Sequence, residues 1–208
     1  MSELEELVGP LVFRDTEPTP FTPILQALLE AIPGAHAATL VDGEGETVDY
    51  TGRGDPFDLR VAAAHLQLML QDIERFNGLG AARWVTVRGR HKSIAATVLP
   101  EGYALTLTLR SRSAFALSTR ALRVCIRALA NEAGWKLPPG DRSWFAASVT
   151  TDRRGRPVRV GAETDVEVLG ALVGLSRRER GFRVRTVNGA EFMLVREACG
   201  QWYADALP

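Results

Sequence analysis

Residues 55–77 read DPFDLRVAAAHLQLMLQDIERFN and predict a long central helix. Asp55 stands at an N-cap position, Pro56 at the first helical position and Asp58 in the first turn. These residues offer acceptors and negative charge to the free amides and the positive dipole end of a helix. Apolar residues then recur at steps of three and four along one face. They are Leu59, Ala62, Leu66, Met69, Ile73 and Phe76.

The same helix carries more apolar surface than a single stripe. A second set extends around its sides: Val61, Ala63, Ala64, Leu68 and Leu70. A helix that rests on one sheet needs only one apolar stripe. We therefore expect this helix to cover its own sheet on one side and to contact a second subunit on the other. The alternative is a helix that is fully enclosed within its own subunit.

The composition is that of an ordinary globular protein with one large domain or two small ones. The chain has 208 residues, of which 46% are hydrophobic and 24% are charged. Its formal net charge is zero, so the whole molecule has no field that would attract nucleic acid or an anionic membrane. No apolar stretch reaches the roughly 18 residues of a membrane span, and residues 1–20 are acidic and unlike a signal peptide. Cys125 and Cys199 lack the spacing of a disulfide framework or a metal site, so a cytoplasmic location is expected.

Turn and cap residues divide the first two-thirds of the chain into regular elements. Thr22-Pro23 repeats the cap-plus-proline pattern, Pro33-Gly34 ends that helix, and Gly43-Glu44-Gly45 supplies a hairpin turn. The expected order is a helix over 22–32, strands over 36–42 and 46–51, the central helix, strands over 83–88, 93–99 and 103–109, and a helix over 113–133. This order predicts an α+β fold, in which helices cover the faces of a five-stranded antiparallel sheet.

Residues 28–52, LLEAIPGAHAATLVDGEGETVDYTG, followed by the capped helix, resemble the opening of the Roadblock, or dynein light-chain-type, family. The similarity covers about residues 20–134 and is strongest with bacterial members that partner the gliding-motility Ras-like GTPase. Members of the family form dimers through the central helix and the strand that follows it. They have no catalytic residues for nucleotide chemistry, and they scaffold complexes or regulate small GTPases.

The resemblance implies a dimer contact made by the outward stripe of the central helix and by the next strand. The residues assigned to this contact are Leu59, Ala62, Leu66, Met69, Ile73, Phe76 and Trp84. The surplus of apolar surface agrees, because burying a few hundred Å² of it at roughly 25 cal/mol per Å² would contribute several kcal/mol. Association costs offset part of that gain. Arg120, Arg123 and Arg127 share one face of the 113–133 helix and are the candidate partner-binding residues.

The final third departs from the family pattern. Residues 1–19 are an acidic segment, residues 20–134 the Roadblock-like domain, residues 135–143 a linker around Pro138-Pro139-Gly140, and residues 144–208 a small α+β module of no assigned family. In that module we expect strands over 144–151, 157–160, 182–187, 190–195 and 201–207. Thr164 and Glu167 have capping-box spacing, which predicts a short helix. Asn188-Gly189 predicts a two-residue hairpin turn. That turn would place Phe182, Val184, Met193 and Val195 on one face.

Motifs for catalysis or metal binding are lacking. Asp42, Glu44 and Glu46 could hold a hard cation, but their turn chemistry favours a solvated hairpin. The three histidines belong to three different elements, and neither cysteine has a local nucleophile signature. We therefore expect no enzyme, no cofactor and no metal site.

Arginine-rich runs in the last third provide an alternative function. Nine arginines crowd two turns, and Trp144, Trp202 and Tyr203 could stack on single-stranded nucleic acid. From residue 141 to the end, however, there are eleven arginines against nine acidic residues, which favours solvated turns over phosphate binding. The first hypothesis is therefore a non-enzymatic cytoplasmic homodimer that binds a small Ras-like GTPase. The alternative is a nucleic-acid-associated adaptor.

Overall fold

The computed structural model describes residues 14–76, 82, 84–111, 113, 117–137 and 144–206. The chain divides into two compact units, Met1–Leu117 with Cys125–Leu137, and Ser118–Val124 with Pro138–Pro208. We call these the N-terminal unit and the C-terminal unit. Residues 1–13 of the acidic segment and the linker residues Pro138-Pro139-Gly140 lie outside the described residues.

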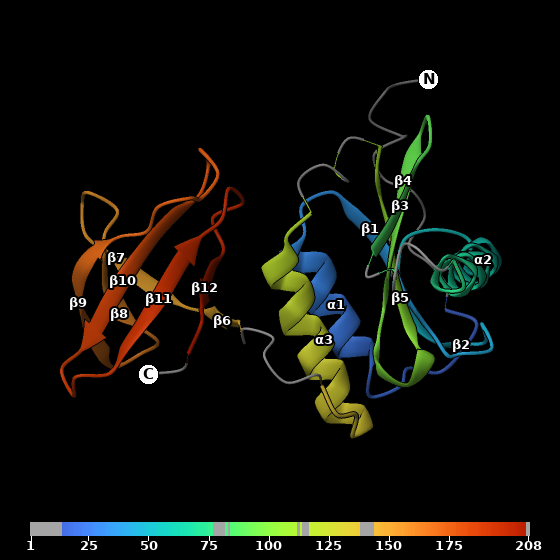
Figure 1. The fold of residues 1–208 in the computed structure, drawn as a ribbon, viewed down its shortest axis with the longest axis horizontal. Coiled ribbons are helices and arrows are strands. Elements are labelled where there is room, and N and C mark those ends of the chain that lie inside the picture. Colours follow the sequence, from blue (N-terminus) through green and yellow to red (C-terminus); the bar gives the residue numbers. More distant parts are fainter. Residues whose placement is uncertain are drawn as a thin grey trace. The chain divides into compact units, whose positions relative to one another are not determined.

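The N-terminal unit is built on a five-stranded antiparallel sheet with the strand order β2-β1-β5-β4-β3. Its elements are α1 (Thr22–Ala31), β1 (Ala35–Val41), β2 (Thr47–Gly52), α2 (Pro56–Glu74), β3 (Trp84–Arg88), β4 (Lys92–Val98), the 3-10 turn η1 (Pro100–Gly102) and β5 (Ala104–Arg110). The helix α3 (Thr119–Ala133) follows, and the boundary between the units falls within it. Figure 1 shows α2 on one face of the sheet and α1 on the other. The predicted α+β fold class is confirmed.

The predicted cap of α2 is present. The side chain of Asp55 accepts hydrogen bonds from the amides of Phe57 (2.8 Å) and Asp58 (3.3 Å). The inward side of α2 packs on the sheet in one apolar cluster, which consists of Val41, Ala63, Leu66, Leu70, Ala96 and Ala104. This packing fixes α2 across the sheet, because small alanines on the strands let the helix approach closely.

Two helix starts differ from the prediction. Phe21, not Thr22, is the N-cap of α1, and no side chain caps it. The Thr22 hydroxyl instead donates to the carboxylate of Asp49 at 2.6 Å, because a buried charge needs every available donor. The helix expected from 113 begins only at Thr119, where the Ser118 hydroxyl accepts from the amide of Ala121 at 2.9 Å.

The C-terminal unit contains a curled antiparallel sheet (Figure 1). Its strands are β6 (Phe145–Ala147), β7 (Val149–Thr151), β8 (Pro157–Val160), β9 (Thr164–Ala171), β10 (Arg180–Thr186), β11 (Glu191–Arg196) and β12 (Trp202–Ala204), in the order β6-β12-β11-β10-β9-β8-β7. Only Ser148 separates β6 from β7, yet these strands stand at opposite ends of the order. The sheet therefore curls round on itself and encloses a core that includes Val184, Leu194 and Trp202.

The short helix predicted after Thr164 is wrong. Residues 164–171 form strand β9, which pairs with β8 and β10. Val166 and Val168 pack against the core, whereas Asp165 and Glu167, which alternate with them along the strand, are exposed. This period of two, with β-branched residues inward, outweighs the local capping-box spacing.

The hairpin at Asn188-Gly189 exists, but its predicted register is wrong by one residue. Thr186 pairs with Ala190, so the loop has three residues, 187–189, and Gly189 supplies the positive φ of 85°. Val184 therefore lies opposite Phe192, not Met193. A slip of one residue turns the partner strand over, so Phe192 and Leu194 join the core, whereas Met193 lies on the opposite face of the strand.

Candidate functional site

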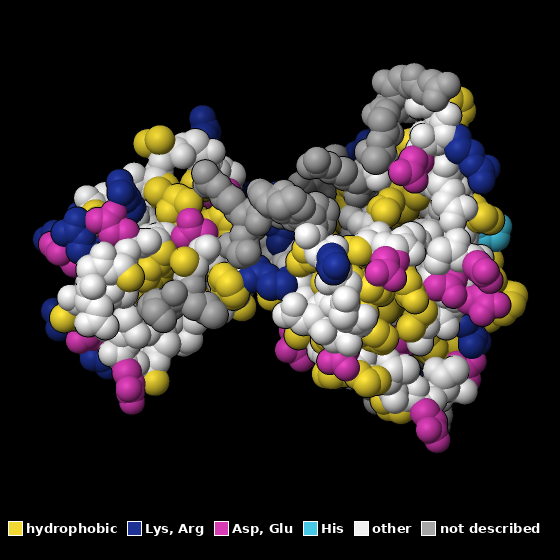
Figure 2. Space-filling model, turned by 60° about the horizontal axis from the view of Figure 1, so that its bottom comes forward, with side chains coloured by type: hydrophobic (Ala, Val, Ile, Leu, Met, Phe, Trp, Pro, Cys, Tyr) yellow, Lys and Arg dark blue, Asp and Glu magenta, His cyan; other side chains and the backbone are white. Residues whose placement is uncertain are grey.

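The side of α2 that faces away from its sheet is largely apolar and exposed. Its five large side chains have exposed fractions of 37% to 66%. They are Phe57, Val61, Leu68 and Met69 of α2 together with Phe76, which lies just past its end, and we call them the α2 outer face. Figure 2 shows hydrophobic, acidic and histidine side chains mixed on the right-hand side of the molecule, where α2 lies in Figure 1. Large exposed apolar residues that cluster on one helix are typical of an interaction surface.

Strand β3 extends this surface to the edge of the sheet. It is the terminal strand and pairs only with β4, so its outer backbone groups face no other strand of the sheet. Val85 packs against the cluster under α2, and Val87 lies on the same face of the strand with 45% of its surface exposed. A short edge strand with exposed valines can pair with another strand.

The predicted contact residues divide into two groups. Met69 and Phe76 belong to the α2 outer face, and Ala62, Ile73 and Trp84 are half-buried. Leu59 and Leu66 are only 7% and 5% exposed, because they pack against their own sheet. They are therefore covered within the protomer and do not belong to an outward stripe.

Sequence reasoning left Phe57, Val61 and Leu68 out of the predicted contact. It chose the apolar stripe with the most regular spacing, whereas the inward arc of α2 includes the polar Gln67, which is 2% exposed. The Gln67 amide donates to the carbonyl of Gly102 at the β4–β5 turn. The burial of this polar residue explains why the spacing of apolar residues misplaced the core-facing side of α2. Phe57 in the first turn is 66% exposed and belongs to the outward side.

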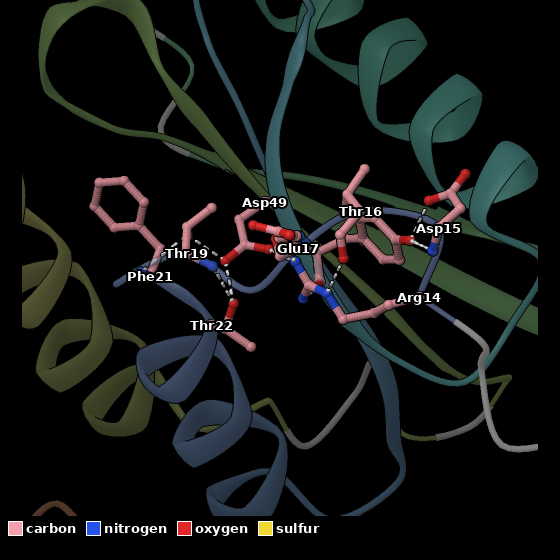
Figure 3. A network of polar contacts seen from close by, with 9 residues as sticks. Arg14, Asp15, Thr16, Glu17, Thr19, Phe21, Thr22 and Asp49 are labelled. Atoms are coloured by element: carbon pink, nitrogen blue, oxygen red, sulfur yellow. Dashed lines mark hydrogen bonds and ion pairs between the residues drawn. The ribbon is translucent and has the colours of Figure 1, made fainter.

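The opposite edge of the same sheet, at β2, carries a dense polar network (Figure 3). The side chain of Asp49 is fully buried and accepts hydrogen bonds from Arg14, Thr19 and Thr22, each at 2.6 Å. Its fourth donor is the amide of Tyr50, at 2.7 Å. Burial alone would raise the pKa of Asp49, but these hydrogen bonds outweigh it and hold the pKa below its ordinary 3.8.

Tyr50 joins this network to α2. Arg14 donates to the main-chain carbonyl of Tyr50, and its guanidinium lies 5.0 Å from the centre of the Tyr50 ring. The Tyr50 hydroxyl donates to Asp15 at 2.5 Å, and Asp15 accepts from Arg60 of α2 at 2.5 Å. Residues 14–22 are thus tied to β2 at several points, and we call them the N-terminal strap.

Of the three predicted partner-binding arginines, Arg120 is engaged within its own unit. Its guanidinium pairs with Glu179 at 2.5 Å and Glu197 at 3.0 Å, and it lies 4.9 Å from the centre of the Trp144 ring. Only 15% of its side chain is exposed. Arg123 and Arg127 are half-buried. Arg120 is therefore held by ionic and aromatic contacts within the C-terminal unit.

Three of the C-terminal arginines and all three aromatic residues of the nucleic-acid alternative have other contacts or are buried. Arg159 pairs with Asp165, and both Arg183 and Arg185 pair with Glu191. The three aromatic residues proposed for stacking, Trp144, Trp202 and Tyr203, are at most 8% exposed. Because stacking needs an open ring face, this part of the alternative hypothesis is wrong.

The remaining candidates have structural roles. Asp42 accepts from the amides of Glu44 and Glu46 at 2.9 Å each, as in a solvated hairpin turn. Within the described part of the chain, no three His, Cys, Asp or Glu side chains come together as metal ligands. Burial raises the pKa of the Cys125 thiol to about 12, which keeps it unreactive. Among the described helices, none is long and apolar enough to cross a membrane.

No family model and no curated protein matches the chain. Solved structures do. A Roadblock/LC7 domain from Streptomyces avermitilis shares 19% identity over 53% of this chain and 95% of its own, with a TM-score of 0.46. MglB of Myxococcus xanthus shares 17% identity over 56% of this chain and 98% of its own, with a TM-score of 0.47. The gliding protein MglB of Thermus thermophilus shares 18% identity over 61% of this chain and 97% of its own, with a TM-score of 0.46. These matches are of the type that the sequence resemblance predicted.

Proposed function

We propose that this protein is a non-enzymatic scaffold or regulator that forms a homodimer through the α2 outer face and the β3 edge. The observation that carries the proposal is the exposed apolar surface of α2 beside β3, the terminal strand of the sheet. An isologous contact would bring two α2 helices and two β3 strands together across a two-fold axis. Antiparallel pairing of the β3 strands would then supply partners for the backbone groups on the outer edge of β3.

The partner that we propose for the dimer is a small Ras-like GTPase. This part of the proposal rests on the sequence resemblance over residues 20–134. A protein of this kind would influence GTP turnover by positioning the GTPase's own residues. Arg120 is already paired with two carboxylates, so it does not serve as an inserted arginine.

Two measurements test the proposal. Light scattering with size exclusion should give the mass of a dimer for the full chain, and a monomer at all workable concentrations would refute the interface. Purified small GTPases of the same genome, loaded with GDP or a GTP analogue, should co-elute with the dimer in one nucleotide state. Co-elution with RNA that is lost steeply with added salt would support the nucleic-acid alternative instead.

A further inference from the structure

One end of the five-stranded sheet is basic and the other is acidic. The strand connections place the start of β1, the ends of β2, β3 and β5 and the start of β4 at the same end. Figure 1 shows the β3–β4 hairpin and the start of β1 at the upper end of the sheet. Five cationic residues belong to this end: Arg53, Arg88, Arg90, Lys92 and Arg110. Asp42, Glu44, Glu46 and Glu101 belong to the turns at the opposite end.

Two of these cations are direct neighbours. Lys92 of β4 is the cross-strand partner of Arg110 of β5. Like charges directly opposite each other on antiparallel strands destabilise a sheet. No acidic residue occurs in residues 84–98 or 104–111, so β3, β4 and β5 supply no carboxylate to this pair.

His36 completes the cluster through an irregularity of β1. The pairing of β1 with β5 shifts between Ala35 and Ala37, so His36 is the extra residue of a bulge, a device that re-aims a side chain. The Arg53 amide donates to the His36 carbonyl at 2.7 Å. Gly52 permits this approach, because a Cβ there would lie 2.2 Å from that carbonyl oxygen. Desolvation, and then the charges of Arg110, Lys92 and Arg53, lower the pKa of His36 below its ordinary 6.5.

We propose that this basic end, formed by His36, Lys92 and Arg110 with Arg53 beside them, binds phosphate groups. A phosphate carries up to two negative charges and three acceptor oxygens, so it can neutralise the Lys92–Arg110 pair and accept from both. A single carboxylate would leave the cluster positive.

The test measures binding of inorganic pyrophosphate to the full chain by calorimetry at constant ionic strength. Saturable binding by the wild type is expected. The melting temperature should also rise more with pyrophosphate than with chloride at equal ionic strength. Lys92→Glu and Arg110→Glu should each weaken binding about ten-fold or more, because each removes a charge-assisted hydrogen bond. Arg75→Glu is the matched control, since Arg75 is an exposed arginine of the same unit that pairs only locally with Asp72.

A second variant keeps the test decisive if a glutamate at this position prevents folding. Lys92→Thr removes the like-charge pair with a residue that suits strands, so it should melt at a higher temperature than the wild type without phosphate and gain little when pyrophosphate is added. Vesicles of phosphatidylglycerol, compared with phosphatidylcholine, distinguish a lipid headgroup from a free phosphate compound as the source. Absence of binding to pyrophosphate and to anionic vesicles, or equal loss in Lys92→Glu and Arg75→Glu, would overturn the proposal.

Discussion

The two edges of the five-stranded sheet differ in almost every respect. At β2, Arg14 of the N-terminal strap donates a hydrogen bond to the main-chain carbonyl of Tyr50, and the buried Asp49 pairs with Arg14. At β3, the last strand of the sheet among the described residues, Val87 is 45% exposed. A covered edge cannot add another strand, whereas an open edge can. The difference restricts growth of the sheet to one direction, so pairing through β3 would produce a closed dimer and not a fibre.

The largest expected effect comes from a charge placed on the inward side of α2. Leu66→Glu would bury a carboxylate among Val41, Ala96 and Leu70, and it should lower the free energy of unfolding by about 4 kcal/mol or more. Circular dichroism in urea measures the loss. A folded Leu66→Glu protein with a reduced mass would instead place Leu66 at the dimer contact.

A change at Asp49 should release the N-terminal strap from the β2 edge. Asp49→Ala leaves the Arg14 guanidinium and two threonine hydroxyls without their acceptor, so the free energy of unfolding should fall by about 3–5 kcal/mol. Urea denaturation gives the value. If the strap blocks assembly, the folded fraction of this variant should also form species larger than a dimer in light scattering. The same mass as the wild type would show that the strap does not limit assembly.

The open edge can be disabled on the other side of α2. Met69→Glu places its charge at a residue that is 45% exposed in the protomer, so the unfolding free energy should change by less than about 1 kcal/mol. The dimer should weaken by about 2 kcal/mol, or about thirty-fold in dissociation constant, because the charge would be desolvated in the contact. Sedimentation equilibrium of Met69→Glu beside Arg178→Glu, a change at an exposed arginine of the C-terminal unit, checks this. An unchanged dissociation constant would remove the α2 outer face from the interface.

Acid should lower the stability that Asp49 contributes at the β2 edge. The pKa of Asp49 is lower in the folded protein than its ordinary 3.8, so the unfolded chain binds more protons in this range. Its contribution to stability is therefore present above pH 3.8 and is lost as the pH falls through the folded pKa. Between about pH 5 and pH 2, urea midpoints of the wild type should fall more steeply than those of Asp49→Asn. Parallel curves would mean that Asp49 does not hold the strap as a carboxylate.

Several parts of the fold could be predicted because the deciding interactions are local. The cap at Asp55 and the turn glycines correctly mark where elements begin and end. Capping hydrogen bonds and positive φ values depend on neighbours in the chain. The hairpin at Asn188-Gly189 was located by the same logic. Its register was not, because the choice between a two- and a three-residue loop depends on which side chains the curled sheet encloses.

The candidate site shows the same division. Sequence periodicity identified an α2 helix with more apolar surface than one sheet can cover, and the structure leaves the five large side chains of the α2 outer face exposed. Which apolar arc faces inward could not be read from spacing, because Gln67 is buried and Phe57 is exposed. The roles of Arg120 and Asp49 were equally hidden, since their partners lie 59 and 35 residues away in the chain.

For the first unit, the sequence by itself determined the order of the elements, the α+β class and the apolar surplus of α2, because propensity, capping and periodicity act within a few residues. Only the tertiary structure decided which side of α2 is covered, that one sheet edge is held by a buried carboxylate while the other is bare, and that Lys92 stands opposite Arg110. Those outcomes depend on strand pairing and burial between residues far apart in the chain, where the free energy of packing outweighs local preference.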